Sequence, residues 1–186
     1  PRMAWDCMIR PKWLFGTLVR TVLNEGMPHF QNMGDKVPAP LISRTAVRGR
    51  AMRDGLSWQH VEHMRRIWKG NLVLKGLLHP EDARIARESG VNGVMVSNHG
   101  GRQLDGTIAP LRMLPGVVDQ AGGMTVMMDS GIRRGTDVLK ALALGAQFVF
   151  IGRPWLYAAS IAGDDGVHHA VGLLRDEIDR DMAMLG

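Results

Sequence analysis

Short apolar runs and longer segments of helical periodicity alternate along the chain from Ser57 onward. The runs are rich in valine, leucine, isoleucine and methionine and contain few polar residues, which is typical of strands covered on both faces. The expected strands are Leu72–Lys75, Gly93–Ser97, Thr125–Asp129 and Gln147–Ile151. Because a helical segment separates each strand from the next, the pattern predicts a parallel α/β sheet.

The segments around these strands carry residues that start and stop helices. We expect one helix capped by Ser57 that runs through Trp68 and is closed by Gly70, and others from Pro80 to Gly90, from Pro110 to Ala121, from Thr136 or Asp137 to Leu144, and through Val167–Met182. The helix at Pro80 begins with proline followed by acidic residues, as first helical turns often do.

The first part of the chain has a different pattern, so we separate an amphipathic and loop segment, residues 1–56, from the regular units of residues 57–186. Within Pro1–Met33, tryptophans and aliphatic residues alternate with basic residues, and the spacing over Lys12–Asn24 suits an amphipathic helix. Such a helix either packs on the protein's own core or contacts a membrane surface, and both interpretations stay open. Gly34–Gly55, with its arginine series, is typical of an exposed loop or linker.

Composition adds a few limits to this picture. A chain of 186 residues with 45% hydrophobic content can form the core of one ordinary domain. The formal charge is +5, but both signs are mixed along the chain and the arginine series lacks interleaved aromatic residues, so we expect no nucleic-acid partner. We find no run long enough to span a bilayer and no signal peptide, and the single cysteine, Cys7, fits a reducing compartment. We therefore expect a cytoplasmic protein, free or peripheral on the inner face of the cell membrane. Because the chain opens on Pro1, we also expect it to be a piece of a longer protein.

Polar residues or glycine and arginine stand where each of the four expected strands ends and a loop begins, at Lys75, Ser97–His99, Asp129 and Gly152-Arg153. The carboxyl ends of parallel strands share one face, so these residues should converge. His99 can take a proton near neutral pH, and the planar fork of Arg102 matches a carboxylate. Such a pair suits a substrate with an acid group and a removable proton; the alternative is a solvated, glycine-rich turn.

Two further loops predict a site for a phosphate. Asp129–Gly135 and Gly152–Pro154 combine glycines, whose amides can approach an anion closely, with arginines and a following helix start. For Arg134 the alternative interpretation, an arginine that only covers the rim of the predicted site, also fits. Lys75 is a Schiff-base lysine, a charge partner for an electron-rich cofactor ring, or a rim residue without a role. The remaining histidines form no ligand cluster with carboxylates or cysteine, so we expect no metal.

Four motifs carry a resemblance to a known family, namely Lys75-Gly76 before Pro80–Ala83, Ser97–Gly106, Asp129–Gly135 and Gly152-Arg153. With them, residues 57–186 closely resemble the FMN-dependent α-hydroxy acid dehydrogenases and oxidases, which include lactate dehydrogenases linked to quinone or cytochrome, mandelate dehydrogenase and glycolate oxidase. The resemblance implies a (β/α)8 TIM barrel, of which this chain supplies roughly the C-terminal half, strands five to eight. It also implies FMN as the cofactor and oxidation of a lactate-like (S)-2-hydroxy acid to the 2-oxo acid.

Carried over by position, the resemblance implies a role for each motif residue. His99 is expected as the catalytic base, Arg102 as the anchor of the substrate carboxylate, and Lys75 as the cation beside the flavin N1 and O2 edge. The other expected FMN contacts are Ser97 near the flavin, Asp129 at the ribityl chain, and Ser130, Gly131, Arg133, Gly152 and Arg153 at the phosphate.

The chain also departs from the family. It has no counterpart of the family's first half, which holds substrate-binding tyrosines and the aspartate that orients the histidine, so we expect a fragment or one part of a split protein. Ser130 stands where many oxidases have glycine, and the opening segment resembles the membrane-contact segment of the membrane-linked dehydrogenases. These features favour a dehydrogenase that passes electrons to quinone or cytochrome and forms homo-oligomers when full length. An oxidase that uses O₂ and a non-catalytic flavin-binding fragment are the alternatives.

Overall fold

The computed structural model describes residues 2–30, 39–40 and 55–186, and its contacts divide the chain into two compact units, Pro1–Leu56 and Ser57–Gly186. The first unit contains α1 (Arg2–Met8), α2 (Pro11–Trp13), a π-helical segment (Leu14–Val19), α3 (Arg20–Glu25), and the antiparallel strands β1 (His29–Phe30) and β2 (Ala39–Pro40). The three consecutive helical segments confirm the helix expected over Lys12–Asn24.

Two further expectations concern the loop over Gly34–Gly55 and membrane-spanning helices. Most of Gly34–Gly55, interpreted as a loop or linker, lies outside the described residues. Among the helices that the structure describes, none has the length and apolar character needed to cross a membrane.

The second unit is built on a parallel sheet in the order β3-β4-β5-β6. Its strands are β3 (Val73–Leu77), β4 (Gly93–Val96), β5 (Thr125–Met128) and β6 (Phe148–Val149). The expected strands are therefore confirmed with small shifts: β3 begins one residue later and continues through an irregularity at Gly76, while β6 is shorter at both ends. The strand order equals the chain order, as successive right-handed βα units require.

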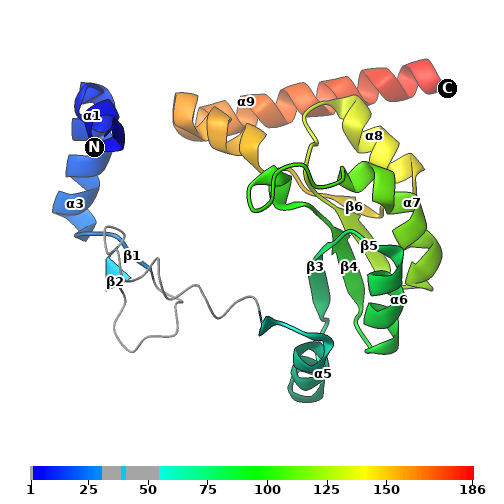
Figure 1. The fold of residues 1–186 in the computed structure, drawn as a ribbon. Helices are drawn as coiled ribbons and strands as arrows, with labels where there is room; N and C mark the ends of the chain where they lie inside the picture. Colours follow the sequence, from blue (N-terminus) through cyan, green and yellow to red (C-terminus); the bar gives the residue numbers. More distant parts are fainter. Residues whose placement is uncertain (1, 31–38, 41–54) are drawn as a thin grey trace. The chain divides into compact units, whose positions relative to one another are not determined.

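Five helices accompany this sheet: α5 (Trp58–Ile67), α6 (Pro80–Glu88), α7 (Pro110–Ala121), α8 (Gly135–Ala143) and α9 (Arg153–Leu185). Figure 1 shows α6, α7 and α8 along one side of the sheet. The last helix is longer than expected, because it begins directly at Arg153 and continues through a kink at Ala162 and Gly163.

The two faces of the sheet differ in burial because successive side chains of a strand point to opposite faces. Leu74, Val94 and Val126 are register partners on the face that packs against the helices. Val94 and Val126 belong to the apolar core, and the partly buried Leu74 packs against it. On the other face, Lys75, Met95, Met127 and Phe148 form a row, and Phe148 is 62% exposed. The helix-covered face is thus a packed core, whereas the opposite face is open.

Candidate active site

The strand ends bring nearly all of the sequence-predicted site residues into one cavity of about 600 Å³. The predicted residues that line it are Lys75, His99, Arg102, Asp129, Ser130, Gly131, Arg133, Gly152 and Arg153. The exception is Ser97, which is fully buried beneath the cavity and hydrogen-bonds to its lining. Lys75 lies within β3 and not at its end as expected, because the strand continues to Leu77, whereas the other residues follow β4, β5 and β6. Residues from all four strands therefore converge, as the parallel order predicts.

Lys75 is held by groups at the ends of the two following strands. Its Nζ donates a hydrogen bond to Ser97 Oγ at 3.0 Å and forms an ion pair with the Asp129 carboxylate. Partial burial acts to raise the pKa of Asp129, but hydrogen bonds from Lys75, Ser97 and Ser130 and the lysine charge outweigh burial, so that this pKa lies below its ordinary value. A lysine paired in this way suits the role of charge partner better than that of a Schiff-base nucleophile.

His99 begins a short 3-10 turn, His99–Gly101, just after β4. Its backbone amide donates to Ser97 Oγ at 3.1 Å, which ties the turn to the buried serine. The imidazole lies against the irregular end of β3, where a Cβ added at Gly76 would come within 3.0 Å of His99 Cε1. Glycine at position 76 therefore leaves room for the ring, and the exposed His99 and Arg102 both line the cavity.

At the start of α8, where an anion site was expected, the backbone amides are already hydrogen-bonded within the protein. The amides of Arg133 and Arg134 donate to Asp137 Oδ2, both at 3.0 Å, and the amide of Gly135 donates to Glu177 Oε2 at 2.8 Å. Two carboxylates of this chain thus occupy the helix start. Arg134 pairs with Glu177 at 2.8 Å, which supports the rim interpretation for that arginine.

The groups that remain for an anion lie at the loop after β5 and the start of α9. A Cβ added at Gly131 or Gly152 would meet nothing within 4 Å, so the backbone there is open to a ligand. In the first turn of α9, Pro154 has no amide N–H and Trp155 donates to the Gly152 carbonyl at 3.1 Å, so the Arg153 amide is the one that faces a ligand there. The side chains of Arg133 and Arg153 line the same cavity. This end of the cavity therefore combines open backbone with two guanidinium groups, a combination that suits a phosphate.

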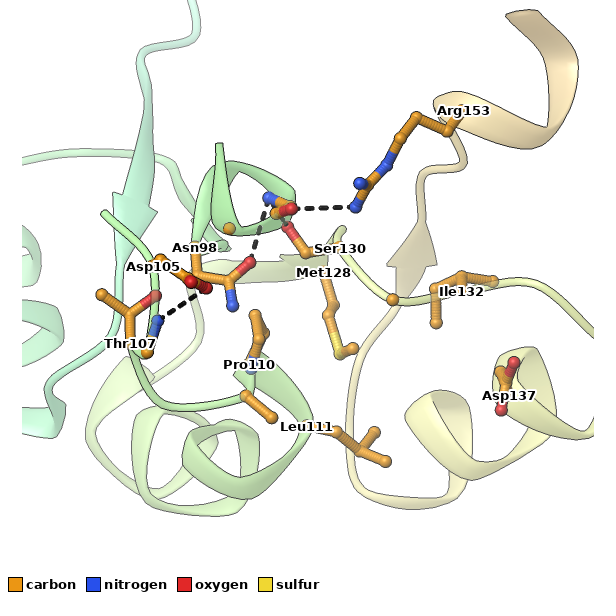
Figure 2. Close-up of a pocket in the computed structure, with 15 residues that line it drawn as sticks. Asn98, Asp105, Thr107, Pro110, Leu111, Met128, Ser130, Ile132, Asp137 and Arg153 are labelled. Atoms are coloured by element: carbon orange, nitrogen blue, oxygen red, sulfur yellow. Dashed lines mark hydrogen bonds between the residues drawn. The ribbon is translucent and has the colours of Figure 1, made fainter. Parts of the chain in front are cut away.

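Arg153 also reaches the histidine loop. Figure 2 shows its side chain extending from α9 toward the loop that carries Asn98, where Nη2 donates to the Gly100 carbonyl at 2.8 Å. The view is of a neighbouring cavity of about 500 Å³, whose lining shares Gly100, Ser130 and Arg153 with the first. The two cavities therefore adjoin along the histidine loop.

A parallel sheet with a cavity lined by basic side chains at the carboxyl ends of its strands is typical of barrel-type α/β proteins. The family model for FMN-dependent dehydrogenases matches residues 1–186, and the chain belongs to this family. It is 37% identical over 185 residues to (S)-mandelate dehydrogenase from Pseudomonas putida, covering 100% of this chain and 46% of that protein. It is 47% identical over 132 residues to L-lactate oxidase from Lysinibacillus sphaericus, covering 70% of this chain and 34% of that protein.

Solved structures of mandelate oxidase agree with this assignment. The complex with (S)-2-phenylpropionate has a TM-score of 0.65 and 47% sequence identity, covering 69% of this chain and 39% of the other. The chain thus spans between about a third and a half of the length of its relatives. Its four parallel strands are roughly the C-terminal half of a (β/α)8 barrel.

The residues present fit FMN, the cofactor of this family. The cavity offers an ammonium group at Lys75 and two guanidinium groups beside open glycine backbone at the far end. Its volume of about 600 Å³ lies within the range of about 300–1,000 Å³ that is usual for cofactor-sized ligands. Charge and space therefore both suit an anionic, phosphate-bearing group.

Sequence reasoning missed two residues that shape the site. Gly100 approaches Arg153 so closely that a Cβ on residue 100 would lie 2.8 Å from Nη2 of the arginine. Glu177 accepts the amide of Gly135, which lies 42 positions earlier in the sequence. The paired glycines after His99 were a local signal for the first. No local signal pointed to Glu177, because its partner is distant in sequence.

Proposed function

We propose that the protein oxidises a small, lactate-like (S)-2-hydroxy acid to the corresponding 2-oxo acid, with FMN as its resident cofactor. The observation that carries this proposal is that His99, Arg102 and Lys75 line one cavity whose far end holds Arg133 and Arg153. A base, a carboxylate-binding fork and an anion site then serve one substrate and one cofactor. The family and the mandelate and lactate enzymes among its relatives support this choice.

In this proposal each residue of the chain has a distinct task. Arg102 binds the substrate carboxylate through its planar fork and so orients C2 and its hydroxyl toward His99. An imidazole nitrogen of His99 accepts a proton from the substrate as two electrons leave C2. FMN supplies the two-electron acceptor when bound.

The same proposal assigns the groups that hold the cofactor. Lys75 would lie beside the flavin ring, where its charge would favour the reduced, anionic form, and Ser97 would support the lysine through their hydrogen bond. Asp129 would hold the ribityl chain, and Ser130, Gly131, Arg133, Gly152 and Arg153 would hold the phosphate. Open backbone at both glycines supports the phosphate assignment.

We further propose a dehydrogenase that is peripheral at the inner face of the cell membrane, delivers electrons to a quinone or cytochrome, and is homo-oligomeric. The support is the exposed apolar surface of the first unit, which comprises Trp5, Met8, Ile9, Trp13, Phe15, Leu18 and Leu23. Arg10, Lys12 and Arg20 lie among these residues in sequence, and such mixtures favour anionic membrane surfaces. An O₂-using oxidase is the alternative, and rapid reoxidation of the reduced flavin in air would identify it.

The direct test is the absorbance spectrum of the purified protein with added FMN, followed by anaerobic (S)-lactate and then (S)-mandelate. We expect FMN to bind and its visible absorbance to bleach with at least one of the two acids. His99→Ala should retain FMN but lose bleaching by about 100-fold or more, because the proton acceptor is gone. FMN binding with undiminished bleaching in His99→Ala would remove His99 from the reaction, and FMN binding without any bleaching in the unmodified protein would support the purely flavin-binding alternative.

A further inference from the structure

The backbone N–H and the backbone carbonyl of Gly100, which follows His99, are both hydrogen-bonded. Its N–H donates to Ser130 Oγ at 2.9 Å and also to Asn98 Oδ1 at 3.0 Å. Its carbonyl accepts from Arg153 Nη2 at 2.8 Å. The contact with Asn98 is local, whereas Ser130 and Arg153 come from the ends of the two following strands. Of these three contacts, the ones with Ser130 and Arg153 therefore tie Gly100 to other parts of the sheet.

The loop needs such ties because of its backbone conformation. His99, Gly100 and Gly101 have φ values of 56°, 68° and 71°, so three consecutive residues are left-handed and one of them carries a side chain. This region is unfavourable for L-residues other than glycine. The observed orientation of His99 therefore depends on interactions from outside the loop.

Ser130 is itself in the left-handed region, with φ at 75°. Glycine would adopt this φ without strain, so what serine adds at this position is its hydroxyl group. That hydroxyl donates to Asp129 Oδ1 at 2.8 Å while it accepts the Gly100 amide. A chain of polar contacts thus runs from Lys75 through Asp129 and Ser130 to Gly100, and Arg153 closes it from the opposite side.

We propose that Ser130 is a positioning residue for His99. Together with Arg153, Ser130 clamps the backbone of Gly100 and so holds the histidine loop in its left-handed conformation. The inference rests on the proposed function only in taking His99 as the base. Arg153 uses one N–H on the Gly100 carbonyl and keeps others for an anion, since a guanidinium has five donors. The phosphate end of the cavity and the base are therefore linked through one side chain.

The test compares Ser130→Ala and Ser130→Gly in the FMN-loaded protein. Both remove the hydroxyl, but glycine also relieves the left-handed strain, so Ser130→Gly keeps the fold even if Ser130→Ala does not. We expect the Gly100 amide to exchange with deuterium about 3- to 10-fold faster in both variants, the factor that loss of one hydrogen bond implies. We expect kcat to fall by a similar factor with KM within about 2-fold, because the substrate anchor Arg102 is untouched.

Ser89→Ala is the matched control, since its hydroxyl donates to the Ile85 carbonyl at the end of α6, away from the cavity. It should change neither Gly100 exchange nor kcat. Unchanged exchange at Gly100 in both Ser130 variants would overturn the clamp. Faster exchange and a lower kcat in Ser130→Ala alone would also overturn it, because the effect would then come from backbone strain. If the unmodified protein does not oxidise 2-hydroxy acids, the proposed function fails, and the exchange rates alone still decide whether the clamp exists.

Discussion

Asp129 is the residue on which the polar contacts of the cavity converge. Its carboxylate pairs with Lys75 and accepts the Ser130 hydroxyl, and these bonds outweigh the burial that acts to raise its pKa. The pKa of Asp129 is therefore lower in the folded protein than the value of about 3.9 that an unfolded chain has. A carboxyl of this kind stabilises the fold above the unfolded pKa and loses that contribution as the pH falls below it toward the folded pKa.

Asp129→Asn should lower the free energy of unfolding by about 1–2 kcal/mol at pH 7, because the ion pair with the partly exposed Lys75 is lost. The variant should also lose less stability than the unmodified protein when the pH falls from about 5 to about 3. Urea unfolding at a series of pH values measures both effects. Asp119→Asn is the control, since Asp119 is exposed and its carboxylate forms no hydrogen bond or ion pair with the described residues. Parallel acid profiles of Asp129→Asn and the unmodified protein would contradict this account of Asp129.

At the scale of elements, the contact between α8 and α9 closes the helix start that would otherwise bind an anion. Gly135 lies at the first turn of α8, and a Cβ added there would be 2.7 Å from Glu177 Cβ and 2.7 Å from the Ile178 backbone nitrogen. The close approach lets Glu177 accept the Gly135 amide and pair with Arg134. The pKa of Glu177 lies below its ordinary value, chiefly because of that backbone hydrogen bond and then because of Arg134.

Gly135→Ala should destabilise the protein by about 1–3 kcal/mol, because the new methyl group forces α9 away from α8. Gly172→Ala tests the same change within α9, where a Cβ would meet nothing within 4 Å. There the higher helix propensity of alanine should stabilise the protein by about 0.5–1 kcal/mol. Thermal and urea unfolding of both variants provide the measurement. Equal effects of the two substitutions would mean that the α8–α9 contact is not tight in solution.

The whole sheet is one half of a barrel and has two unlike faces. Leu114 of α7 is fully buried against the helix-covered face, while Phe148 on the opposite face is 62% exposed. The rings of Phe148 in β6 and of Phe150, just after this strand, have centroids 6.3 Å apart. In a closed barrel this face would be the interior, so its exposure follows from the share of the barrel that this chain supplies.

Phe148→Ala should cost less than about 1 kcal/mol in the 186-residue chain, since most of the ring is already in solvent. Leu114→Ala, by contrast, should cost about 2–5 kcal/mol, because it opens a cavity in the packed core. Urea unfolding at low protein concentration compares the two variants. A large cost for Phe148→Ala would mean that another surface covers the open face in solution.

Much of this protein was predictable from local patterns. Apolar runs separated by helical segments predicted the four strands and their parallel order, because periodicity and helix caps depend on neighbours in sequence. Lys75 at the end of the first apolar run, and His99, Asp129 and Arg153 at or after the ends of the next three, predicted that these residues would meet, since parallel strands end at one face. The family resemblance of the same motifs predicted FMN as the family's cofactor.

Long-range contacts decided the rest. Only the folded chain places Glu177 on the Gly135 amide, 42 positions away, and thereby leaves Gly131 and the start of α9, without the start of α8, as the candidate phosphate site. Likewise, Arg153 reaches the Gly100 carbonyl across 53 positions. The sequence by itself determined which residues stand at the strand ends, whereas tertiary structure determined which of their donors and acceptors are satisfied within the protein. The reason is that such pairing depends on distances between elements, which local periodicity does not encode.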